Sequence, residues 1–190
     1  FELSGGFALR SSWGPDPVFL LSVGGFNPHF TPPPDFRAPD RLAISLATSD
    51  NPRIRLESYL AITSNSLQIG ARLDAFGSIE FLGVWSAQVY ASFDALFTFE
   101  PFQFIVDLAG GVQICHDGKP FLGASFLLSL QGPEPLRAIG YVEVVFLGTH
   151  RIPLDITIGT GREQAAITAA DPATLLAAAI KDQRNWSAVP

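Results

Sequence analysis

Apolar and polar residues alternate with a period of two through most of the sequence from Arg41 to Ile158. Over 53–63, for example, one face carries aliphatic residues such as Leu56, while the other carries Arg55 and Glu57. Such alternation predicts antiparallel strands with one face covered and the other face polar. We therefore expect a mostly β fold, an antiparallel meander or sandwich of about nine to eleven long amphipathic strands.

Turn signals divide the chain into these strands. We expect strands at 1–10, 18–26, 41–48, 53–63, 66–74, 77–83, 84–99, 102–114, 120–131, 136–147 and 151–158. His116-Asp117-Gly118 predicts a tight hairpin, because Asp-Gly favours the positive φ that such turns need. The segment Asp74–Gly77 predicts a further turn, Gly132–Pro135 predicts a strand end, and Gly110-Gly111 predicts a bulge or sharp bend.

The chain is expected to have three parts within one compact unit. Residues 1–39 hold N-terminal strands and a Pro-rich loop, a stiff segment that suits either a rigid strap over the end of a sheet or a recognition segment. Residues 40–160 hold the antiparallel core, and 161–190 hold a linker and one C-terminal helix capped by Asp171. Because the chain begins at Phe1 and contains no Met, we expect a piece of a longer protein.

Composition narrows the classes of partner and compartment. The net charge of −6 leaves no basic cluster for a phosphate backbone, so we expect no nucleic-acid partner. The single Cys115 excludes an internal disulfide and a cysteine-based zinc cage, and it favours a reducing, cytoplasmic compartment. Arg outnumbers Lys among many Ala, Gly and Pro residues, which indicates a bacterial source. No apolar stretch approaches the roughly 20 residues of a membrane-spanning helix.

One candidate surface is a long apolar face. Alternate residues of 84–99 are apolar, and the pattern continues through 102–108 and 122–130. Its aromatic members are Trp85, Phe93, Phe97, Phe99, Phe102, Phe104 and Phe126. We expect a second sheet or the terminal helix to cover this face. The alternatives are a groove for a lipid-like ligand and contact with an equivalent sheet of a neighbouring subunit.

The opposite, polar face supplies weaker candidates. They are Glu57, Tyr59, Asp74, Tyr90 and Asp94. Turned inward, this face would pair carboxylates for acid–base chemistry, as in a glycosidase. Turned outward, it would be a solvated surface with cross-strand charge pairs, and this is the arrangement that we expect.

The sequence predicts no catalytic residue, no cofactor site and no metal site. Gly159-Thr160-Gly161 follows a strand but lacks the spacing of a phosphate loop. His29, His116 and His150 lie in separate segments, without the spacing of metal ligands on one element.

Four sequence segments together resemble a known family. They are Leu21–Pro28 with the Pro run that follows it, Thr63–Gly70, Phe93–Leu96 with Glu100–Phe102, and Leu130–Pro133. They resemble an uncharacterised domain family of very large bacterial proteins, some of them encoded near phage-tail-like contractile injection genes. The resemblance spans most of the chain and implies a fragment of a larger protein. It implies no activity and no catalytic residues.

These observations favour three functions, in order. The first is a non-catalytic structural or interaction module of a larger bacterial protein or assembly, whose partners are adjacent domains or subunits. The second is a binder or carrier of an apolar, lipid-like ligand. The third is an enzyme acting on a carbohydrate or polymer through the polar-face carboxylates. The sequence leans away from an enzyme.

Overall fold

The structure is a computed structural model of the 190-residue chain, and it describes residues 1–47, 50–146, 148–159 and Lys181. The chain divides into two units, Phe1–Thr160 and Gly161–Pro190. The helix expected from Asp171 lies outside the described residues except for Lys181. In the described part of the chain, no helix is long and apolar enough to cross a membrane.

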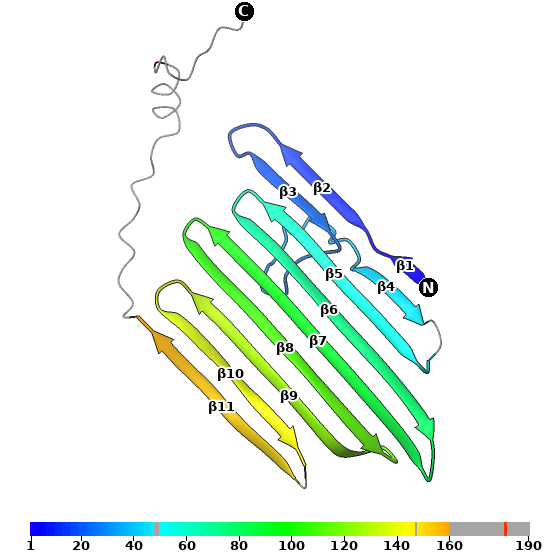
Figure 1. Ribbon diagram of the computed structural model, residues 1–190. Helices are drawn as coiled ribbons and strands as arrows, with labels where there is room; N and C mark the ends of the chain where they lie inside the picture. The colour runs from blue at the N-terminus through cyan, green and yellow to red at the C-terminus, as the bar shows by residue number, and fades with distance from the viewer. Residues whose placement is uncertain (48–49, 147, 160–180, 182–190) are drawn as a thin grey trace, which may run out of the picture. The chain divides into compact units, whose positions relative to one another are not determined.

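Eleven antiparallel strands form a single sheet in the first unit (Figure 1). They are β1 (Glu2–Ser4), β2 (Phe7–Ser12), β3 (Val18–Val23), β4 (Leu42–Ala47), β5 (Arg53–Thr63), β6 (Ser66–Glu80), β7 (Val84–Phe99), β8 (Phe102–His116), β9 (Lys119–Gly132), β10 (Leu136–Val145) and β11 (Thr149–Ile158). From β5 to β11 each strand pairs with the next along the chain. The predicted mostly β meander is thereby confirmed, and the described strands form one layer and no sandwich.

Two strands share one edge of β5. β4 pairs with β5 from Ile54 to Ser58, and β3 pairs with it from Leu60 to Thr63. Residues 24–40 connect β3 to β4, and we call this Pro-rich connection the strap. Gly24 starts it with a φ of +77°, and a Cβ there would lie 2.4 Å from the Ser58 carbonyl oxygen. Only glycine fits this conformation and this close approach.

One expected turn is strand instead. β6 runs through Asp74–Gly77 without interruption, so the two strands predicted at 66–74 and 77–83 are one. Ala75 pairs with Ile54 on β5 and with Val89 on β7. Pairing on both sides of β6 therefore overrides the local turn preference of this segment.

Two further turn predictions have different outcomes. The Asp117-Gly118 hairpin is present, with φ values of 49° and 73° that suit the predicted tight turn. The bulge predicted at Gly110-Gly111 is wrong, because both glycines pair in regular register with β7 and β9. The irregularity falls between Ile114 and Cys115. Gly110 instead makes room for a neighbour, since a Cβ there would lie 2.8 Å from the ring of Phe126.

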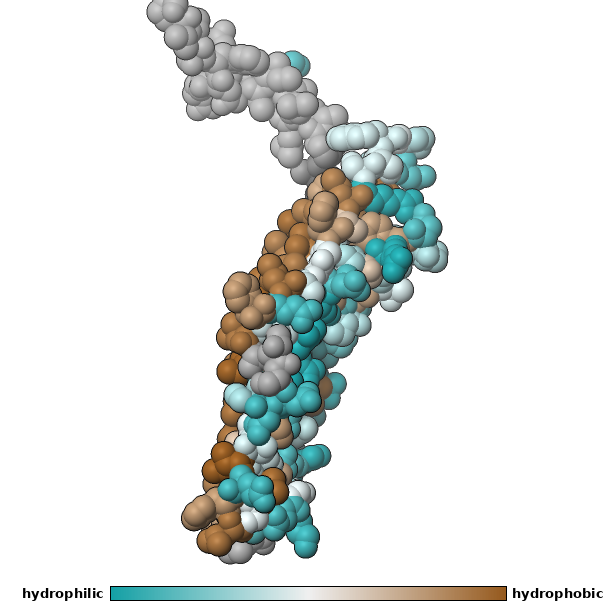
Figure 2. Space-filling view, turned by 90° about the vertical axis from the view of Figure 1, so that its right-hand side faces the viewer, coloured by the Kyte–Doolittle hydropathy of each residue, from teal (hydrophilic) through white to brown (hydrophobic). Residues whose placement is uncertain are grey.

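The two faces of the sheet differ in chemistry, as the brown and teal sides of Figure 2 show. We call the brown side the apolar face. One of its cross-strand rows consists of Leu56, Leu73, Ala91, Gly110, Phe126, Val142 and Ile152. We call the other side the polar face. One of its rows consists of Tyr59, Gly70, Asp94, Asp107, Ser129, Ile139 and Asp155.

A compact buried cluster lies on the polar face, against the strap. Leu20 and Ala61 of the sheet pack with Phe26 of the strap, and two more strap rings, Phe30 and Phe36, join them. The ring centroid of Phe26 is 5.2 Å from that of Phe30 and 5.7 Å from that of Phe36. Burial in the described residues is therefore deepest under the strap, whereas we expected it on the apolar face. The structure differs from this expectation because three Phe rings of the strap pack against a face that is otherwise polar.

Candidate functional site

The apolar face carries all seven aromatic side chains predicted for it. Phe97 pairs with Phe104 and Phe99 with Phe102 across β7 and β8, and their alternation places Trp85 and Phe93 on the same side. Phe126 continues the face on β9, opposite Gly110. Among the described residues nothing covers this face, and Phe126 keeps 45% of its surface exposed. The expected cover by a second sheet is absent from the described part of the chain.

The apolar face is also almost free of charge. Apart from the turn row of His116 and Lys119, its described positions from β5 to β11 include no Asp, Glu, Lys or Arg. Its members are mainly Ile, Leu, Val, Phe, Ala and Gly. Such a surface can contact hydrocarbon or another apolar surface without desolvating an ion.

The apolar face is large for an exposed surface. β6, β7, β8 and β9 have 15, 16, 15 and 14 residues. At about 3.3 Å per residue these strands are roughly 50 Å long, and neighbouring strands lie about 4.8 Å apart. Across the nine strands of the sheet path, and allowing for shorter outer strands, the face covers roughly 1,500 Å². The largest apolar patch of a typical monomer is about 300–600 Å².

On the other side of the sheet, the strap is fastened by polar contacts from several strands. Arg41 donates hydrogen bonds to the carbonyl oxygens of Gly24 and Phe26, at 3.2 and 2.8 Å. The backbone N–H of Asn27 donates to Oε1 of the fully buried Gln68 on β6, at 3.0 Å. Ser22 Oγ donates to the Gly25 carbonyl oxygen at 2.6 Å. These contacts satisfy backbone groups that the strap would otherwise bury unpaired.

Tyr59, a predicted polar-face candidate, lies beneath this connection. Its hydroxyl donates a hydrogen bond to Asp94 Oδ1 at 2.8 Å, and the Arg41 guanidinium lies 4.0 Å from the centre of its ring. Burial raises the pKa of the Tyr59 phenol, and the hydrogen bond to the Asp94 carboxylate raises it further. The Tyr59 side chain is only 4% exposed, so this part of the polar face is not the solvated exterior that we expected.

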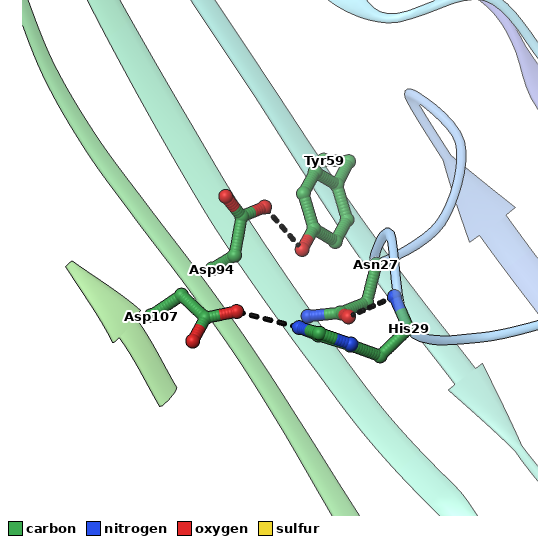
Figure 3. A network of polar contacts seen from close by, with 5 residues as sticks. All are labelled: Asn27, His29, Tyr59, Asp94 and Asp107. Carbon is green, nitrogen blue, oxygen red and sulfur yellow. Dashed lines mark hydrogen bonds and ion pairs between the residues drawn. The ribbon is translucent and has the colours of Figure 1, made fainter. Parts of the chain in front are cut away.

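A second carboxylate lies next to Asp94. Asp107 on β8 is its cross-strand partner, and Oδ2 of Asp107 lies 2.6 Å from Nε2 of His29 on the strap (Figure 3). The Asn27 side chain positions His29 by accepting a hydrogen bond from its backbone N–H, at 2.8 Å. This network joins the strap to β8. The sequence pattern raises His29 only as a candidate metal ligand and does not predict this contact, because the position of Asn27 and His29 over β8 depends on the path of the strap.

The remaining polar-face candidates lie apart from this network. Asp74 lies 3.7 and 3.8 Å from Arg53 and Arg72, and Glu57 accepts a hydrogen bond from Arg55 at 2.8 Å. Tyr90 packs over Gly111, where a Cβ would lie 2.8 Å from its ring. The structure therefore joins Tyr59 to Asp94 by a hydrogen bond, places Glu57 beside the same hollow, and leaves Asp74 and Tyr90 in separate contacts.

Two open polar hollows lie beside these residues. The first, of about 210 Å³, is lined by Arg41, Glu57, Tyr59, Arg72 and Asp94, among others. The second, of about 440 Å³, is lined by Arg53, Arg55, Glu57, Arg72 and Asp74. Both mix charges of opposite sign, and in the described residues no three His, Cys, Asp or Glu side chains are placed to hold a metal ion.

The comparison with known families covers the whole sheet. A family model described as "Family of unknown function (DUF6603)" matches residues 1–188. The chain belongs to this family. No curated protein and no solved structure matches the chain. The DUF6603 match agrees with the expectation of an uncharacterised domain family, and the fold of this member is the antiparallel meander described above.

Proposed function

We propose that this DUF6603 chain is a non-catalytic structural or interaction module of a larger bacterial protein or assembly. The apolar face is its contact surface, and its partners are adjacent domains or subunits. The observation that carries the proposal is a nearly charge-free face of roughly 1,500 Å² that the described residues leave uncovered. The resemblance to domains of very large bacterial proteins, some encoded near phage-tail-like contractile injection genes, supports the same role.

Covering the apolar face is energetically favourable. At about 25 cal/mol per Å², covering roughly 1,500 Å² of apolar surface is favourable by tens of kcal/mol before the costs of association are subtracted. Exposed side chains such as Leu73 on β6 and Val89 on β7 contribute, because the sheet alone leaves 37% and 42% of their surfaces accessible. Contact with another apolar surface is therefore strongly favoured for a face with this composition.

The polar face supports a structural role as well. The Asp94 carboxylate accepts a hydrogen bond from Tyr59 within the sheet, and the contact of Asp107 with His29 attaches the strap to the sheet. Glu57 and Asp74 are engaged by neighbouring arginines. We assign these groups to holding the sheet and strap together.

Carbene footprinting of the protein in its native assembly, prepared without detergent, tests the proposal. We expect Leu73 and Phe126 on the apolar face to be labelled several-fold less than in the unfolded chain. Exposed polar-face controls, Arg72 and Gln88, should be labelled far more strongly than these two residues when each is compared with the unfolded chain. Labelling of the apolar face at the level of these controls would overturn the contact role. Stoichiometric lipid in native mass spectrometry would replace it with the carrier function.

A further inference from the structure

We propose that the apolar face is covered by the apolar face of a second copy of this chain, so that two sheets form a face-to-face β-sandwich. This inference rests on the proposed function, because it names the occupant of the same contact surface. Four properties of the face lead to this occupant: its area, its lack of charge, its pattern of large and small side chains, and the net charge of the chain.

Area decides between a helix and a sheet as the cover. A helix over the predicted segment 171–182 would be about 18 Å long and about 10 Å wide, so it would cover roughly a tenth of the face. A sheet of the same extent would cover all of it. The area of roughly 1,500 Å² per partner also falls in the range of obligate homodimers, which bury about 2,000–5,000 Å² in total.

The absence of charge allows the apolar faces of two copies to contact each other. In a two-fold dimer the same surface of both copies forms the interface, so residue i contacts residue j and residue j contacts residue i. A charged residue near the axis would therefore lie next to the same charge on the other copy. The described rows of the apolar face from β5 to β11 avoid this, because they contain no Asp, Glu or Arg, their one Lys is Lys119 at a turn, and His150 lies on the edge strand β11.

The net charge of −6 per copy does not oppose this arrangement. The Asp and Glu side chains of the polar faces point outward from a sandwich whose sheets are about 10 Å apart. Charges on opposite outer faces are then about 20 Å apart, more than two Debye lengths at physiological salt, and are largely screened.

Shape supports the pairing of two identical sheets. The cross-strand rows contain both large and small side chains, as where Ala91 and Gly110 lie between Leu73 and Phe126. Another row of the apolar face also has a small residue between larger ones, with Ala95 between Ile69 and Val106. Sheets with the same twist pack aligned, with side chains of one inner face between those of the other. The rows supply both the protruding side chains and the spaces for them.

Charge also argues against an anionic lipid surface as the occupant. Stable binding of an apolar surface to such a membrane is strengthened by basic residues around it. The chain has only two lysines, its arginines on β5 to β11 lie on the polar face, and its net charge is negative. A second copy needs no such basic residues.

A matched pair of glutamate substitutions on β7 tests the inference. Val89 on the apolar face and Gln88 on the polar face are adjacent, both exposed in the isolated sheet, and each substitution adds one negative charge. We expect light scattering after size exclusion to give a dimeric mass for the wild type and for Gln88→Glu. We expect Val89→Glu to be monomeric with the same β-sheet circular dichroism.

Val89→Thr keeps the size and strand preference of valine. It is the second test variant, for use if Val89→Glu does not fold. The dimer dissociation constant should rise at least about tenfold, because each copy buries an unpaired hydroxyl. A monomeric wild type, or a dimer that neither Val89 variant weakens, would overturn the second copy as occupant. A monomer whose apolar face is still protected in the native assembly would leave the proposed contact role intact. Free labelling of that face would overturn both.

Discussion

Asp94 on β7 and Asp107 on β8 are directly opposed on adjacent strands of one face, and each carboxylate contacts a different partner. Like charges in directly opposed positions destabilise a strand pair. Here the Tyr59 hydroxyl donates to Asp94, and His29 on the strap contacts Asp107. The repulsion is thereby offset by two contacts, and one of them holds the strap against the sheet.

Tyr59 should make stability depend on pH in the alkaline range. Its pKa is raised above the ordinary value of 10.0, so above about pH 10 the unfolded chain loses this proton while the folded chain keeps it. The contribution is therefore fully present below about pH 10 and is lost as the pH rises toward the folded-state pKa. Urea unfolding at a series of alkaline pH values should show this fall in the wild type. It should be smaller in Tyr59→Phe and retained in Tyr90→Phe, and an equal fall in Tyr59→Phe would contradict the assignment.

The contact between His29 and Asp107 should couple these residues only weakly. Both side chains are partly exposed, at 45% and 34%, and such pairs contribute about 0.2–1 kcal/mol. A double-mutant cycle with His29→Gln and Asp107→Asn measures the coupling by chemical unfolding near neutral pH. We expect it to shrink in high salt. A coupling of several kcal/mol that is insensitive to salt would show that this pair does more than fasten the strap.

Gln68 should be far more sensitive to substitution than a glutamine on the solvated surface. It is fully buried, accepts from the Asn27 N–H and donates to Ser66 Oγ at 3.1 Å. Gln68→Ala leaves a buried backbone donor without a partner, which should lower the free energy of unfolding by about 1–3 kcal/mol. The exposed Gln88→Ala on β7 is the control and should change it by less than about 0.5 kcal/mol. Equal effects of the two substitutions would show that the strap does not depend on this contact.

Two Phe residues on opposite faces should respond differently to truncation. Phe26 under the strap is 7% exposed, and Phe26→Ala should cost about 3–5 kcal/mol. Phe126 on the apolar face is 45% exposed in the sheet alone, so Phe126→Ala should cost clearly less in the Val89→Glu background, where we expect a monomer. In the wild-type background its cost should rise with protein concentration. A cost for Phe126→Ala that is the same in both backgrounds would contradict cover by another chain.

The sequence predicts the sheet far better than it predicts the polar network. Period-two alternation determines which side chain of a strand lies on which face, so the sequence alone places Phe97 and Phe104 on one face. Asp117-Gly118 could be predicted because its turn depends on the local backbone alone.

The features that the sequence did not predict correctly have a common physical cause. Asp74–Gly77 has the composition of a turn, yet strands on both sides extend β6 through it. His29 reaches Asp107, 78 residues away, only because the strap crosses the sheet, and no local pattern encodes that path. Both features depend on tertiary contacts between distant segments.

The run of nearest-neighbour hairpins from β5 to β11 has an evolutionary consequence. Each of these strands finds its partner through a short turn, so a hairpin can be gained or deleted between β8 and β11 without rerouting the rest of the chain. Sheet width is then a quantity that gene duplication can change in steps of two strands. Relatives with broader or narrower sheets should therefore keep the strap end of the sheet and vary toward the β11 end.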